Sequence, residues 1–116
     1  MGRSGGSLLA ANEQGCAEQL ARFFPHTKAV RVPVQVSCSR GGQTPLREAT
    51  VVEFGGAEHA IFLSTLPLEF DERLRLEGPP EEGPAEATVV AVQYHEGRKA
   101  VAVRFLRGSC NWVIKP

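Results

Sequence analysis

The sequence lacks the residue patterns that mark most catalytic and metal-binding sites. Its three cysteines form no Cys-x-x-Cys pair, and the three histidines have no second ligand or acidic partner at a useful spacing. The histidines are His26, His59 and His95. No nucleophile is matched with a general base in the sequence, so a small β-barrel enzyme is the least favoured class. These absences predict a protein that is not an enzyme and that holds no metal or cofactor.

Net charge and long hydrophobic runs are missing too. Lys plus Arg equals Asp plus Glu at 13 each, which argues against broad binding to nucleic acid or anionic membranes. No stretch approaches the roughly 18 apolar residues of a spanning helix, and the short apolar run near the N-terminus does not suit a signal peptide. An odd number of cysteines fits reduced thiols. We therefore expect a soluble, cytoplasmic protein without membrane insertion.

The length allows one globular domain with a modest core. The chain has 116 residues, of which 42% are hydrophobic, and a second domain will not fit. We expect residues 1–11 to be disordered, because this Gly- and Ser-containing segment has little apolar surface to offset the entropy of ordering. Residues 12–116 are then the single domain.

A short helix is predicted at the start of that domain. Apolar residues fall at helical spacing between residues 12 and 24, and Pro25 follows as a stop signal. A helix of this length is marginal alone, so we expect it to dock on the sheet through Leu20, Phe23 and Phe24.

After the helix the apolar period changes from helical to two, as in strands with one buried face. The expected strands cover 30–38, 48–54, 59–64, 73–77 and the two arms of a hairpin over 87–106, with a closing strand or plug at 112–114. Pro33 must lie at an edge or a bulge, because proline cannot donate to a ladder. Leu66, Leu68 and Phe70 are expected to cap one end of the core. Six to seven short strands in successive hairpins predict an all-β antiparallel barrel or sandwich, and a barrel leaves no exposed edge.

The clearest pattern is the hairpin over 87–106, in which two β-branched runs are joined through Glu96-Gly97. A two-residue loop puts Val92 opposite Val101. An uninterrupted register then puts Val90 opposite Val103. The residues expected to face the interior are Val90, Val92, Val101, Val103 and Phe105. The other face, which includes Ala100 and Ala102, carries small or polar side chains and is expected to be solvent-exposed.

The order of these features resembles the PilZ domain over residues 22–114. The shared features are a basic stretch before the first strand, a Gly-rich turn after the second, a Leu-rich loop before an amphipathic strand, and a final hairpin that ends in Val103-Arg-Phe105. The closing residues 110–116 are similar to the tail of divergent bacterial PilZ-like proteins. The resemblance implies a six-stranded antiparallel barrel that serves in signalling as a receptor of the bacterial second messenger cyclic di-GMP.

PilZ domains hold this nucleotide with Arg-x-x-x-Arg before the first strand and Asp/Asn-x-Ser-x-x-Gly after the second. Guanidinium groups grip phosphate and stack on guanine, while small residues let the backbone approach the base. Here Arg31 stands where the second arginine falls, Thr27 replaces the first, and residues 53–58 read Glu-Phe-Gly-Gly-Ala-Glu. A shifted alignment pairs Arg22 with His26. The resemblance thus implies a weakened ligand site at Arg22, Lys28, Arg31, Glu53, Gly55 and Gly56.

Plainer interpretations remain open at the same residues. Basic side chains that flank a helix end or alternate along a strand are usually solvated, and a glutamate before a turn is usually a surface carboxylate. A PilZ-like domain without nucleotide acts as an adaptor through protein–protein interaction, which is the alternative function. Cys16 and Cys38 are expected in the core, and Cys110 more exposed. Trp112 is either a core plug or an anchor for a protein partner.

Overall fold

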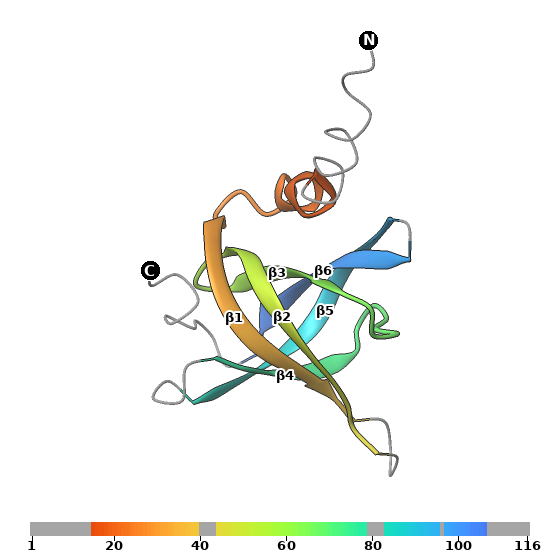
Figure 1. Cartoon of the computed structure of the whole chain (residues 1–116). Coiled ribbons are helices and arrows are strands. Elements are labelled where there is room, and N and C mark those ends of the chain that lie inside the picture. Colours follow the sequence, from red (N-terminus) through yellow and green to blue (C-terminus); the bar gives the residue numbers. More distant parts are fainter. Residues whose placement is uncertain (1–14, 40–43, 79–82, 96, 107–116) are drawn as a thin grey trace.

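The computed structural model describes residues 15–39, 44–78, 83–95 and 97–106 (Figure 1). They form a closed barrel of six antiparallel strands, which confirms the all-β barrel with a short helix. The strands are β1 (Lys28–Cys38), β2 (Leu46–Gly55), β3 (His59–Ser64), β4 (Arg73–Glu77), β5 (Pro84–His95) and β6 (Arg98–Phe105). The expected disorder of 1–11, the expected strand at 112–114, Cys110 and Trp112 lie outside the described residues.

The strands follow one another around the barrel in the order β1-β2-β3-β6-β5-β4, and β4 pairs with β1 to close it (Figure 1). This closing seam is short, because β1 and β4 pair only from Gln35 to Ser37 on the β1 side. Pro33 is exposed and precedes the seam, so at Pro33 only β2 pairs with β1. Its missing amide hydrogen is tolerated there, as expected for an edge position.

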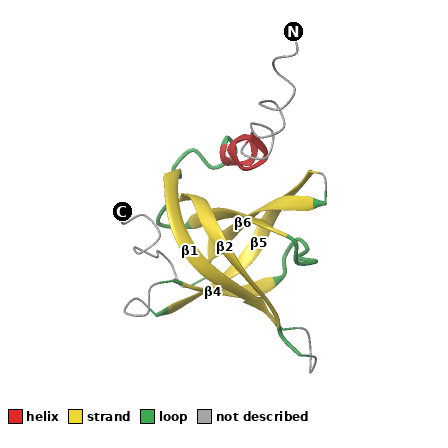
Figure 2. Ribbon diagram, in the orientation of Figure 1, coloured by secondary structure: helices red, strands yellow, loops and turns green. Residues whose placement is uncertain are grey.

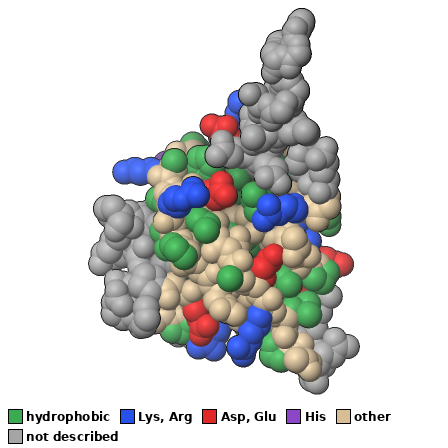
Figure 3. Space-filling view, viewed as in Figure 1, with side chains coloured by type: hydrophobic (Ala, Val, Ile, Leu, Met, Phe, Trp, Pro, Cys, Tyr) green, Lys and Arg blue, Asp and Glu red, His purple; other side chains and the backbone are tan. Residues whose placement is uncertain are grey.

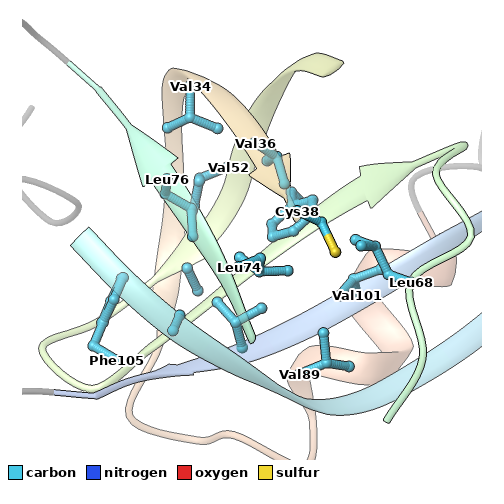
Figure 4. Close-up of a cluster of buried hydrophobic side chains, with 14 of the residues drawn as sticks. Val34, Val36, Cys38, Val52, Leu68, Leu74, Leu76, Val89, Val101 and Phe105 are labelled. Atoms are coloured by element: carbon cyan, nitrogen blue, oxygen red, sulfur yellow. The ribbon is translucent and has the colours of Figure 1, made fainter. Parts of the chain in front are cut away.

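The interior of the barrel is apolar and draws on all six strands (Figure 4). Along β1, alternate residues point inward from Val32 to Cys38, and the Cys38 thiol donates a hydrogen bond of 2.8 Å to Glu72 Oε2. The largest fully buried side chains of this cluster include Phe62, Leu68, Leu76, Val36, Val52, Val89, Val101 and Val103. Burial of each such side chain contributes about 1.5–3 kcal/mol to stability.

The register of the last hairpin differs from the uninterrupted one. Val92 does lie opposite Val101, but a bulge between Val89 and Ala91 makes Val89 the partner of Val103. Val90 is the extra residue of this bulge and packs outside the barrel, so its predicted interior position was wrong. A bulge inserts one residue into one strand and reverses the faces of the residues beyond it.

The helix covers residues 15–21 and packs on the outer face of β3 and β6 (Figure 2). Cys16, Ala17 and Leu20 are buried there, against a group that includes Ile61, Leu63, Ala100 and Ala102. The docking of Leu20 and Phe24 is confirmed, whereas Phe23 is 75% exposed and does not take part. The face that was expected to be solvent-exposed is therefore covered by the helix at Ala100 and Ala102. The small side chains there let the helix approach closely.

The loop between β3 and β4 closes one end of the barrel. Leu68 is fully buried and Leu66 packs against the same core, as expected, but Phe70 points out and is 71% exposed. The loop is held at its start by Glu48 of β2, whose carboxylate accepts hydrogen bonds from the Ser64 hydroxyl at 2.6 Å and the Thr65 hydroxyl at 2.7 Å. Lys99 donates a hydrogen bond from Nζ to the Leu66 carbonyl.

Candidate functional site

The start of β1 and the end of β2 bring together five of the six residues expected at the ligand site. Lys28 lies directly opposite Gly55. The β2–β3 turn follows at once, and its Gly56 amide donates a hydrogen bond of 2.8 Å to the His59 carbonyl. The basic start of β1 and the glycines of the turn are therefore neighbours, although Gly55 follows Lys28 by 27 positions in the sequence.

A bulge lies beside this pair. Ala29 pairs with Phe54 and Val32 with Val52, so Val30 and Arg31 together stand opposite Glu53. Arg31 is exposed and Glu53 is half-buried. Bulges re-aim side chains, and this one places the backbone positions of Arg31 and Glu53 on adjacent strands at the same level of the barrel.

Gly56 serves the packing of the chain itself. A Cβ at this position would lie 3.0 Å from the His26 carbonyl oxygen and 3.5 Å from the Thr27 Cα. The glycine expected to admit a ligand is thus approached by the backbone of residues 26 and 27. A pocket lies beside this contact.

That pocket has a volume of about 350 Å³ and is lined by His26, Thr27, Gly56, Ala57, Glu58 and His59. Burial lowers the pKa of His59 below its usual value; the Glu58 carboxylate opposes this, and Arg104 and His26 add to it. The neutral imidazole is therefore favoured near neutral pH. Glu58 puts a carboxylate in the pocket, which disfavours phosphate at that point.

Arg22 stands apart from the other expected residues. It is exposed on the turn after the helix, where its amide donates to the Gln19 carbonyl at 3.2 Å. Among the described residues, none of Arg22, Lys28 and Arg31 makes an ion pair. Their positive charges are therefore free of carboxylate partners in the described part of the chain.

A second basic site lies at the opposite end of β1 and was missed by the sequence reasoning. Ser37 has Arg47 of β2 as its partner on one side and Arg75 of β4 on the other. These three residues line a groove of about 350 Å³ together with Arg73 and Ser39. In the sequence, the three arginines are visible only as outward positions of two strands that are distant in the chain, so no local motif marks them.

In the described ranges, no group of three or more His, Cys, Asp or Glu residues is placed to hold a metal ion. No helix within them is long and apolar enough to cross a membrane. No model of a known protein family matches the chain, and no curated protein matches it.

Proposed function

We propose that this chain is a PilZ-like domain that acts as a non-enzymatic receptor of cyclic di-GMP in bacterial signalling. The observation that supports this most directly is the pairing of β1 with β2. It gathers Lys28, Arg31, Glu53, Gly55 and Gly56 at one end of a six-stranded barrel. These residues are the ones that the PilZ resemblance assigns to the nucleotide.

The chemistry of this end of the barrel suits an anionic purine nucleotide. Lys28 and Arg31 are exposed, and within the described residues neither is engaged in an ion pair. They are thus free to form charge-assisted hydrogen bonds with phosphate. Glu53 offers a carboxylate that accepts hydrogen bonds from a guanine edge.

The expected affinity is below that of a PilZ domain with both motifs intact. The site has one arginine on β1 where the family uses two, and Glu58 adds a carboxylate to the adjoining pocket. Loss of one charge-assisted partner costs about 1.5–3 kcal/mol, or roughly tenfold to a hundredfold in affinity.

Calorimetric titration with cyclic di-GMP at low salt tests the receptor function. We expect measurable heat with the wild-type protein and a loss of about tenfold or more in affinity for the Lys28→Ala/Arg31→Ala variant. The matched control is Arg47→Ala/Arg73→Ala, which removes two exposed cations at the other end of the barrel. If cyclic di-GMP still binds the Lys28→Ala/Arg31→Ala variant but no longer binds the control, the nucleotide site is the groove of Arg47 and Arg73 instead.

The alternative function is a nucleotide-independent adaptor that acts by protein–protein interaction. It is favoured by three large side chains that the barrel leaves in water: Phe23, Phe70 and Tyr94 are 75%, 71% and 73% exposed. Aromatic residues of this kind are enriched where proteins bind one another. An absence of heat at millimolar cyclic di-GMP would reject the receptor function in favour of the adaptor.

A further inference from the structure

We propose that the groove formed by Ser37, Ser39, Arg47, Arg73 and Arg75 binds the phosphate group of a small ligand. This site is independent of the cyclic di-GMP site proposed above. Lys28 begins β1 and Ser37 stands near its end, nine residues on. At about 3.3 Å per residue of strand, the two sites lie roughly 30 Å apart along β1.

The groove owes its shape to the short seam of the barrel. Pairing between β1 and β4 stops at Ser37 and Arg75, so the next residues of each strand, Cys38 and Leu74, are not paired with one another. Both line the groove. The strands therefore part here and leave an opening with an apolar floor and a polar rim.

Three guanidinium groups surround that opening. Arg47, Ser37 and Arg75 occupy neighbouring positions on three adjacent strands and share the outer face. Since paired strands are about 4.8 Å apart, the backbones that carry Arg47 and Arg75 are roughly 10 Å apart, with Ser37 between them. Arg73, two residues before Arg75 on β4, lies on the same face.

The charge of the groove is positive. The charged residues that line the groove are three arginines and one carboxylate, Glu86. Arg75 has a loose ion pair with Glu77, in which Nε lies 3.8 Å from Oε2. Arg47 and Arg73 make no ion pair with any described residue. Figure 3 shows basic side chains at the lower end of the face in view, with acidic side chains beside them, and further basic side chains in its upper half.

These groups fit phosphate better than a single carboxylate. A guanidinium offers a rigid fork of donors that matches two phosphate oxygens at once, and three of them with two hydroxyls supply more donors than one carboxylate accepts. The volume of about 350 Å³ leaves room for an organic group beside the phosphate, against the Leu74 floor. The ligand is therefore a small phosphorylated molecule.

The test is a titration of the ¹⁵N-labelled protein with pyrophosphate and with inorganic phosphate, followed by NMR at constant ionic strength held with chloride. We expect saturable shifts at the amides of Ser37, Ser39, Arg47 and Arg73–Arg75. Arg47→Ala/Arg73→Ala should weaken binding of pyrophosphate about tenfold or more. Lys28→Ala/Arg31→Ala is the matched control, and it should leave the shifts at the amides of the groove and the affinity derived from them unchanged.

A third variant separates fork geometry from charge. Arg47→Lys keeps the charge but loses the bidentate fork, so we expect an affinity between those of wild type and Arg47→Ala. The proposal is overturned if phosphate, like chloride, shifts the amide resonances of the whole basic surface and not those of the groove alone. It is also overturned if the Arg47→Ala/Arg73→Ala variant binds pyrophosphate as tightly as wild type does. Because the substituted arginines are exposed, thermal unfolding of each variant should match wild type.

Discussion

The ring of Phe24 lies against the imidazole of His59, with ring centroids 4.8 Å apart and ring planes tilted by 47°. This contact joins the segment after the helix to the first residue of β3. It also helps to shield the imidazole from water, and burial is the largest cause of the lowered pKa of His59. The helix and the barrel are therefore linked at a titratable group beside the candidate nucleotide pocket.

The domain should lose stability as the pH falls from about 7 to 5. The pKa of His59 is lowered in the folded state, so the unfolded chain binds the proton more readily in this range. The contribution of the neutral imidazole is fully present above the unfolded pKa, near 6.5, and is lost as the pH falls through the folded pKa. Urea unfolding at several pH values measures this loss of stability. His59→Gln should flatten the profile, and a profile flattened equally by His26→Gln would contradict the assignment to His59.

A methyl group at Gly56 should destabilise the protein. The Cβ would meet the His26 carbonyl oxygen at 3.0 Å, and that atom belongs to the backbone and cannot simply rotate away. We expect Gly56→Ala to lower the free energy of unfolding by about 1–3 kcal/mol. Gly15→Ala is the control, since nothing lies within 4 Å of a Cβ there, and it should stabilise the helix by about 0.5–1 kcal/mol. Equal stability of Gly56→Ala and wild type would show that residues 26 and 27 pack elsewhere.

Val89 and Val90 give a direct test of the bulge on β5. Val89 is fully buried in the barrel, whereas Val90 packs at the margin of the helix contact. We expect Val89→Ala to cost about 2 kcal/mol and Val90→Ala less than about 1 kcal/mol, as measured by denaturant unfolding. An uninterrupted hairpin would give the reverse order, so the two variants control for each other.

Glu48→Gln should weaken the anchor of the β3–β4 loop. Burial alone would raise the pKa of Glu48, but hydrogen bonds from Ser64 and Thr65 and the charge of Arg98 outweigh it and lower the pKa. The carboxylate therefore stabilises the fold above its unfolded pKa, near 4.5, and this is lost as the pH falls through the folded value. The variant should lose about 1–2 kcal/mol at pH 7, since the site is partly exposed.

The control for this anchor is Glu77→Gln, at a surface ion pair, which should change stability by less than about 0.5 kcal/mol. As the pH falls from the unfolded pKa near 4.5 through the lower folded pKa, wild type and Glu48→Gln should converge in stability. A gap between them that stays constant across that range would mean that the charge of Glu48 does not contribute.

Leu20 is the anchor of the helix, with 4% of its surface exposed. Leu20→Ala should lower the free energy of unfolding by about 2–3 kcal/mol and speed hydrogen exchange over residues 15–21. Phe23→Ala, at an exposed neighbour on the same segment, should fall within about 0.5 kcal/mol of wild type. If the two variants were equally stable, the helix would not depend on this contact.

Local chemistry in the sequence was enough to predict the barrel. Alternation along β1 assigned Val32, Val34, Val36 and Cys38 to the interior correctly, because side chains of a strand alternate between faces whatever its partner is. The docked helix followed from a single apolar stripe with Leu20 at its centre. The sequence also singled out the start of β1 and the turn after β2 as one candidate site, and the strand pairing places Lys28 beside Gly55.

What the tertiary structure decided is where neighbouring strands slip or part. Residues 87–92 read Ala-Thr-Val-Val-Ala-Val, so either Val89 or Val90 could fill the same interior place, and only the cross-strand packing selects Val89. Similarly, Phe70 and Phe23 are apolar in sequence, but both side chains are exposed in the described part of the chain. The groove of Arg47, Arg73 and Arg75 exists because β4 closes on β1 for three residue pairs and then diverges. Such a long-range register depends on how the whole barrel closes, which local sequence patterns do not encode.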